Sequence, residues 1–244
     1  MDEWFATIDT TCSLETAILL RLRDVGFAVI SGPVKSSDMA KLAATHDAAV
    51  SAAVVDDVHV GSTTTRVSDL VNRDAAFDEL YLYPPLLKAC CSVISRPFKL
   101  STMHARTVRA GAHAQRLHVD FESKDDGWPM VGFIYMIDEF RNGNGATRFV
   151  PGSHHWPVEP NNDQKNQLVD PDNHRSACGP AGSLIIFNGS IWHGHSANLS
   201  ATPRRSIQGA FIRREERSGA ELPARMTPET LARISPLAKY LLAI

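Results

Sequence analysis

The sequence predicts a single domain with a β core, an antiparallel sandwich or barrel, and helices packed against it. The chain has 244 residues, 43% of them hydrophobic and 21% charged, which are ordinary values for a globular protein of this size. Apolar residues recur at helical spacing in residues 1–98. From residue 99 to residue 213, short apolar runs are separated by Gly, Asn or Pro, as in proteins built from many short strands.

The N-terminal part is predicted to be mostly helical. Three segments have apolar side chains at helical spacing: residues 14–25, 38–54 and 74–94. Ser13 is a plausible N-cap for the first of them. Pro84-Pro85 interrupts the third, because proline lacks the amide hydrogen that a helix interior needs. A short buried strand is expected at residues 27–30, where Phe, Ala, Val and Ile precede a Ser-Gly-Pro turn.

The β core is predicted from six short apolar runs. They are residues 99–108, 115–121, 130–137, 146–150, 182–187 and 204–213. The remaining part, residues 214–244, is expected to be a helical tail, with a helix at 228–243 that Pro236 interrupts.

Composition excludes several classes of partner. The 25 basic and 27 acidic side chains give a formal charge of −2, so no bulk positive field favours nucleic acid or an anionic membrane. The N-terminus, MDEWFATID, lacks the basic and apolar regions of a secretory signal, and no apolar stretch approaches a bilayer span. We therefore expect a cytoplasmic protein that binds a small molecule, and neither nucleic acid nor a membrane. The sequence says nothing about oligomeric state.

Ten histidines, against four cysteines without CxxC spacing, direct attention to metal or proton chemistry. His118 and Asp120 are two residues apart in the run 115–121, so in a strand both side chains point to one face. Together they would supply two ligands of a metal site. A second histidine would complete the two-histidine, one-carboxylate triad of non-haem Fe(II) oxygenases.

The third ligand is sought in the segment Ile191-Trp192-His193-Gly194-His195. His193 is the candidate, with His195 as the alternative. Arg204 and Ser206 follow, and in a strand they share a face that suits a carboxylate, since a guanidinium can bind it through two hydrogen bonds. Arg205 would replace Arg204 if the strand register moved by one residue.

These motifs together resemble the phytanoyl-CoA dioxygenase (PhyH) family. The motifs that carry the resemblance are His118-x-Asp120, the segment NGNGATRFVPGSH at 142–154, His193-Gly194 and Arg204-x-Ser206. The similarity extends over roughly residues 14–213. It implies a double-stranded β-helix core (a jelly roll, cupin-like) and dependence on Fe(II), 2-oxoglutarate and O₂.

The resemblance also implies roles for individual residues. His118, Asp120 and His193 would bind Fe(II), 2-oxoglutarate would fill two further positions, and O₂ the last. Arg204 would bind the distal carboxylate of 2-oxoglutarate, together with Ser206. Cosubstrate positions in related enzymes match Gln115, Thr147 and Arg66, and less closely Thr107. The family activity is oxidation of an organic molecule, most simply hydroxylation, with release of succinate and CO₂.

Candidate substrate contacts are less well determined. They are Trp128, in the loop after the His-x-Asp motif, Phe133 and Tyr135 in the run 130–137, and His195. The sequence does not decide whether His104 faces the pocket. Two alternatives to the dioxygenase are a non-catalytic β-barrel that binds a metal or ligand, and a cupin-type metalloenzyme that does not use 2-oxoglutarate. The triad argues against the first, and Arg204 against the second.

Overall fold

The chain folds around two antiparallel sheets, and the computed structural model describes residues 2–156 and 173–244. The strands of the larger sheet run in the order β1-β8-β5-β10-β4-β3-β2, and those of the smaller sheet in the order β7-β6-β9. The strands are β1 Phe27–Ser31, β2 Val58–Val60, β3 Thr64–Val67, β4 Phe98–Val108, β5 Met130–Met136, β6 Thr147–Phe149, β7 Arg175–Ser176, β8 Ser183–Asn188, β9 His193–His195 and β10 Arg204–Arg213.

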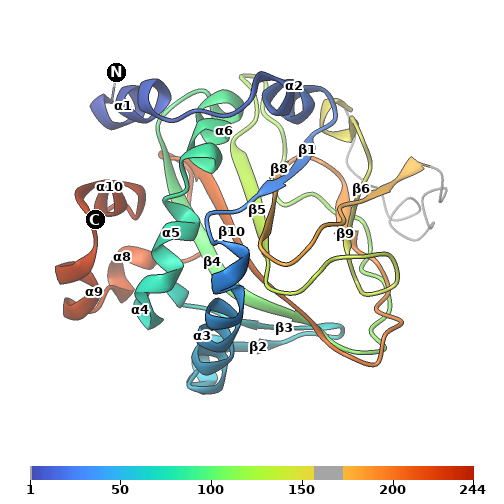
Figure 1. Cartoon of the computed structure of the whole chain (residues 1–244). Helices are drawn as coiled ribbons and strands as arrows, with labels where there is room; N and C mark the ends of the chain where they lie inside the picture. Colours follow the sequence, from blue (N-terminus) through green and yellow to red (C-terminus); the bar gives the residue numbers. More distant parts are fainter. Residues whose placement is uncertain (1, 157–172) are drawn as a thin grey trace.

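Helices cover one face of the larger sheet, and the smaller sheet lies on the other side (Figure 1). The helices are α1 Glu3–Thr11, α2 Thr16–Asp24, α3 Met39–Ser51, α4 Leu70–Arg73, α5 Asp78–Tyr81, α6 Pro84–Ile94, α8 Leu222–Arg225, α9 Pro228–Arg233 and α10 Pro236–Leu241. Among the described residues, no helix is long and apolar enough to cross a membrane.

Two apolar layers follow from this arrangement. The strand β5 is buried along its whole length, because its alternate side chains face opposite layers. Tyr135 packs in the layer between the sheet and the helices, where Leu86 of α6 also lies. Ile134 packs between the two sheets, with Phe149 and Phe187. The space between the sheets also contains the pocket described below.

The helix ends explain why the predicted breaks fall where they do. The α6 helix begins at Pro84, and α10 at Pro236, each with proline in the first turn, where the missing amide hydrogen costs nothing. The Oγ of Ser235 accepts a hydrogen bond from the Ala238 amide and caps α10. The prediction that Ser13 caps the first predicted helix is wrong: α2 begins at Thr16, and Glu15 holds the cap position without a side-chain bond.

Three other expectations need correction. The run 115–121 forms no strand; it makes a single bridge, between His118 and His193. Helix α1 and the β2–β3 hairpin were not predicted. The hairpin strands are short and β2 is largely exposed, so they lack the apolar alternation by which the other strands were found.

Candidate metal and cosubstrate site

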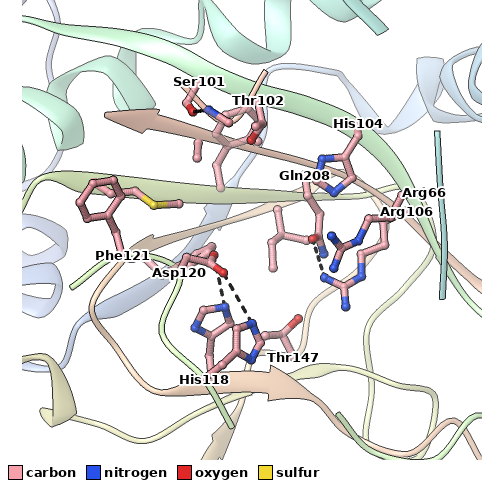
Figure 2. Close-up of a pocket in the computed structure, with 18 of the residues that line it drawn as sticks. Arg66, Ser101, Thr102, His104, Arg106, His118, Asp120, Phe121, Thr147 and Gln208 are labelled. Atoms are coloured by element: carbon pink, nitrogen blue, oxygen red, sulfur yellow. Dashed lines mark hydrogen bonds and ion pairs between the residues drawn. The ribbon is translucent and has the colours of Figure 1, made fainter. Parts of the chain in front are cut away.

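Three side chains that could together hold a metal ion meet beside the smaller sheet. The ligand atoms of His118, Asp120 and His193 all lie within 4.8 Å of one another. The two Asp120 oxygens lie 3.5 Å from Nε2 of His118 and 3.4 Å from Nε2 of His193 (Figure 2). Two imidazoles and one carboxylate on one side of a cation are the donor set of a non-haem Fe(II) site with open positions. The residues present therefore fit such a metal.

Backbone pairing places the two imidazoles side by side. The amide of His118 donates to the His193 carbonyl at 3.0 Å, and the His193 amide donates to the His118 carbonyl at 2.9 Å. The ring centroids are consequently only 4.4 Å apart. Leu117 and Val119 pack against Trp192 on the opposite side. The alternation expected of a strand thus holds locally, although the segment has no continuous ladder.

Each imidazole is oriented by a backbone carbonyl. Nδ1 of His118 lies 3.1 Å from the Arg116 oxygen, and Nδ1 of His193 lies 2.9 Å from the Ile191 oxygen. A carbonyl only accepts hydrogen bonds, so each ring carries its proton on Nδ1 and leaves Nε2 free to bind a metal. Both rings are thereby held in the tautomer that metal binding requires.

The electrostatics of the site favour an ionised Asp120 carboxylate beside a neutral His118 imidazole. Burial in the pocket raises the pKa of Asp120, but the charge and hydrogen bond of His193, together with those of His118, outweigh it and hold that pKa well below its usual range. Burial, followed by the neighbouring His193, lowers the pKa of His118. These are the protonation states in which Asp120 and His118 can bind a cation.

A cavity of about 380 Å³ opens beside the three ligands. Its described lining contains many polar groups: Arg66, Ser101, Thr102, His104, Arg106, Gln115, Thr147, His195, Gln208 and Arg217, besides the metal ligands. The apolar part comes mainly from Phe121, Met130, Phe133, Ile134, Phe187, Ala210 and Ile212. In Figure 2, Phe121 lies to one side of the Asp120 carboxylate, and Arg66 and Arg106 lie to the other. The cavity thus has a cationic end and a more apolar end.

Arg204 and Arg205 occupy opposite sides of β10. Arg204 is 1% exposed; its Nη1 donates to Ser206 Oγ at 3.1 Å and its Nη2 to the Gly145 carbonyl at 2.8 Å. No carboxylate forms an ion pair with it among the described residues. The Arg205 guanidinium instead pairs with Asp138 and Asp47, both at 2.6 Å. Of the two arginines, Arg204 is therefore the one directed inward, although it does not itself line the cavity.

The other predicted cosubstrate residues come together in the cavity wall. Gln115, Thr147 and Arg66 all line it. Thr147 lies opposite His195 across the β6–β9 pairing, and the Gln115 amide donates to the His195 carbonyl at 2.9 Å. Thr107 does not line the cavity. Side chains alternate along β4, so Thr107 points to the face opposite that of Arg106, which does line the cavity.

The predicted substrate contacts divide into two groups. Phe133 and His195 line the cavity. Trp128 and Tyr135 do not, and those two predictions need correction. Nε1 of Trp128 donates to the His154 carbonyl, which directs the indole to that loop. Tyr135 faces the helical layer, where its hydroxyl donates to Met39 Sδ at 3.3 Å.

His195 is a pocket residue whose nitrogens already have partners. Its Nε2 lies 3.0 Å from Thr63 Oγ1, and its Nδ1 lies 2.8 Å from the Ser196 carbonyl. Neither nitrogen belongs to the group of metal-binding atoms. The sequence did not decide whether His104 faces the pocket, and in the structure it lines the cavity.

Sequence reasoning missed Arg106 and Gln208. Both line the cavity, and Nη1 of Arg106 donates to Gln208 Oε1 at 3.0 Å (Figure 2). The signal that could have found Arg106 is strand alternation, since it lies two residues from His104 on β4. That signal becomes useful only when the inward face of β4 is known.

Comparison with known proteins decides the family. Residues 22–206 match the sequence profile described as phytanoyl-CoA dioxygenase (PhyH). The chain belongs to this family. Multifunctional dioxygenase prhA of Penicillium brasilianum is 30% identical over 222 residues, which cover 82% of this chain and 73% of prhA.

Two further relatives match over shorter lengths. Dioxygenase cdmA of Talaromyces verruculosus is 36% identical over 108 residues, covering 41% of this chain and 35% of cdmA. Dioxygenase trt7 of Aspergillus terreus is 30% identical over 165 residues, covering 63% of this chain and 56% of trt7. The match therefore spans about a third to a half of the length of these two proteins.

Solved structures show the same fold. HygX from Streptomyces hygroscopicus, with nickel, 2-oxoglutarate and hygromycin B bound, superposes with a TM-score of 0.71 at 18% identity, over 88% of this chain and 93% of HygX. The epimerase SnoN, in complex with Fe³⁺, α-ketoglutarate and nogalamycin RO, gives 0.66 at 16% identity, over 81% and 82%. The predicted double-stranded β-helix is confirmed. The family and the His-Asp-His group together support an enzyme that uses iron and 2-oxoglutarate.

Proposed function

We propose that the protein is an Fe(II)- and 2-oxoglutarate-dependent dioxygenase that hydroxylates a small organic molecule. The observation that carries the proposal is the meeting of His118, Asp120 and His193 at a cavity with an inward-facing arginine nearby. Bound Fe(II), with 2-oxoglutarate and O₂, supplies the oxidation: 2-oxoglutarate becomes succinate and CO₂, and one oxygen atom enters a substrate C–H bond.

The three ligands hold the metal on one side and leave the cavity side open. His118 and His193 bind through Nε2, in orientations fixed by the Arg116 and Ile191 carbonyls. Asp120 supplies the only carboxylate among the described residues that line the cavity. A carboxylate at this position, in place of a small residue, favours hydroxylation over halogenation, for which a halide would need the third ligand position.

The cosubstrate is assigned to the cationic end. Arg204, with Ser206 beside it, binds the distal carboxylate of 2-oxoglutarate, while Gln115, Thr147 and Arg66 line its path to the metal. The support is the burial of Arg204 without a carboxylate partner among the described residues, since a buried guanidinium needs a counter-charge. Burial, followed by the charge of Arg106, lowers the pKa of Arg204 to about 9, and a bound dianion would relieve that penalty.

The substrate is assigned to the opposite, more apolar end, where it contacts Phe121, Met130 and Ile212. Phe133 and His195 remain substrate candidates. A cavity of about 380 Å³ accepts a small organic molecule. HygX and SnoN were solved with hygromycin B and nogalamycin RO, and we infer that this chain also acts on a small molecule.

The test is a screen for compounds that stimulate 2-oxoglutarate consumption. Purified protein with Fe(II), ascorbate and 2-oxoglutarate is incubated with a small-molecule library, and succinate is quantified. We expect basal succinate formation that a substrate increases, and loss of both in His193→Ala. No succinate from well-folded, iron-loaded protein would leave the non-catalytic binding protein as the better interpretation.

A further inference from the structure

The cationic end of the cavity has a feature that the proposed function does not use. Arg106 on β4 is 9% exposed and lines the cavity. Its two bonded nitrogens donate to neutral amides: Nη1 to Gln208 Oε1 at 3.0 Å, and Nη2 to Gln115 Oε1 at 2.9 Å. Its Nε has no partner. A buried guanidinium held by two amide oxygens is fixed in place, but its charge is not neutralised.

A second arginine lies beside the first. Arg66 on β3 is directly opposite Arg106 in the β3–β4 pairing, so both side chains leave the sheet on the same face. Figure 2 shows the two guanidinium groups at the same end of the cavity. The Nε of Arg66 is also buried without a partner. Like charges directly opposite each other destabilise a sheet, so this pairing favours an anion between or beside them.

The net charge around the cavity also favours a bound anion. Arg66, Arg106, Arg217 and the nearby Arg204 contribute four positive charges, against the one carboxylate of Asp120 among the described lining residues. Fe(II) and the 2-oxoglutarate dianion cancel each other. A positive excess therefore remains even with metal and cosubstrate bound. Burial, followed by the charge of Arg66, lowers the pKa of Arg106 to about 10, as expected of a cation without a counter-ion.

We propose that Arg106, with Arg66 beside it, forms a carboxylate-binding subsite in this cavity. The carboxylate comes either from 2-oxoglutarate, as a second contact besides Arg204, or from an acidic substrate. The subsite depends on the proposed function only because both use the same cavity. In either case Arg106 positions its ligand: Gln208 and Gln115 fix the plane of the guanidinium, and Nε and the second hydrogen on each Nη remain available to a carboxylate.

The first experimental arm measures 2-oxoglutarate binding by calorimetry on nickel-loaded protein, in which the metal is not oxidised. Arg106→Gln is compared with Arg106→Lys, and with Arg141→Gln as a control that removes one exposed charge outside the cavity. If the carboxylate is that of 2-oxoglutarate, Arg106→Gln raises Kd by roughly 10- to 100-fold. Arg106→Lys restores part of the affinity, and the control leaves Kd unchanged.

The second arm tests an acidic substrate. Benzoate and its neutral counterpart benzamide are titrated into metal-free and nickel-loaded protein, and binding is read from calorimetry and thermal shift. Binding of benzoate but not benzamide, lost in Arg106→Gln while the Kd of 2-oxoglutarate is unchanged, assigns the subsite to the substrate. Because the metal-free protein is included, this arm remains informative even if 2-oxoglutarate does not bind and the proposed function fails.

Thermal unfolding separates a ligand-binding arginine from a structural one. Removing an unneutralised buried charge should leave the Tm of the ligand-free protein unchanged or raise it, whereas losing a structural arginine lowers it. If Arg106→Gln does not fold, Arg66→Gln replaces it, since Arg66 is only partly buried. Unchanged affinity for both 2-oxoglutarate and benzoate in the folded variants would overturn the proposal.

Discussion

Replacing Arg204 by Gln tests whether this residue binds 2-oxoglutarate. Arg205→Gln, at the next position in the chain, is the control. The Arg204 guanidinium is fully buried and lies 3.9 Å above the centroid of the Phe140 ring. Gln keeps a hydrogen-bonding group of smaller size but removes the charge. Arg205→Gln removes the same charge from the other face of the strand, where Asp138 and Asp47 neutralise it.

The expected increase in the Kd of 2-oxoglutarate follows from the guanidinium hydrogens of Arg204 that have no partner. Ser206 and Gly145 each take one hydrogen of the guanidinium, and Nε has no partner. The remaining donors can form charge-assisted hydrogen bonds to a carboxylate, each contributing about 1.5–3 kcal/mol. A loss of about 2–4 kcal/mol in binding corresponds to a roughly 30- to 700-fold increase in Kd.

The assay is calorimetric titration of 2-oxoglutarate into nickel-loaded protein. We expect Arg204→Gln to raise Kd within that range and Arg205→Gln to change it less than about twofold, since the half-buried ion pairs of Arg205 lie on the far face of the strand. Thermal unfolding of each variant verifies that the fold is retained. Normal affinity in Arg204→Gln with weakened affinity in Arg205→Gln would refute the assignment of strand faces.

Three further predictions concern the metal, the packing of β5 and a buried ion pair. His193→Ala should abolish metal binding at this site and succinate formation while the fold is retained, as measured by metal analysis and circular dichroism. Gly132→Ala should destabilise the protein by about 1–3 kcal/mol in chemical denaturation, because the new Cβ would lie 2.2 Å from Cζ of Phe187. Asp57→Asn should cost about 3 kcal/mol, because it leaves the largely buried Arg73, which pairs with Asp57 at 2.6 Å, without its counter-charge. Burial raises the pKa of Asp57, but the hydrogen bond and charge of Arg225 outweigh it and lower that pKa, so this stabilisation is present above about pH 4 and lost as the pH falls through the folded-state pKa.

Each of these predictions has a matched control. His113→Ala removes an exposed histidine and should leave metal binding intact. Gly61→Ala adds a Cβ whose nearest neighbour is 3.5 Å away, so its cost should be small. Asp56→Asn changes an exposed carboxylate next to Asp57. If a control costs as much as its partner variant, the specific contact is not the cause.

The sequence predicted which candidate ligands would lie close together better than it described the segment that holds them. The spacing of His118 and Asp120 indicated a shared face, and the two side chains do share one. The intervening Val119 and the preceding Leu117 supply the apolar alternation. No strand forms there, because the amides of the segment pair at uneven intervals: His118 with His193, and Asp120 with the Gly189 carbonyl.

What the sequence could not provide was register between distant strands. Arg66 and Arg106 become neighbours only through the pairing of β3 with β4, and the β2–β3 hairpin was not predicted. Tyr135 and Ile134 are neighbours on β5 and therefore point to opposite faces, but only the packed layers decide which face meets the cavity. Local spacing predicts which side chains share a face, and tertiary pairing decides what that face contacts.

The most direct test of the central claim is anaerobic addition of Fe(II) and 2-oxoglutarate to the purified protein, followed by visible absorption. We predict the charge-transfer band that Fe(II) and 2-oxoglutarate give when both are bound, and its loss in Asp120→Ala. Absence of the band from well-folded, iron-loaded wild-type protein, or its persistence in Asp120→Ala, would contradict the account.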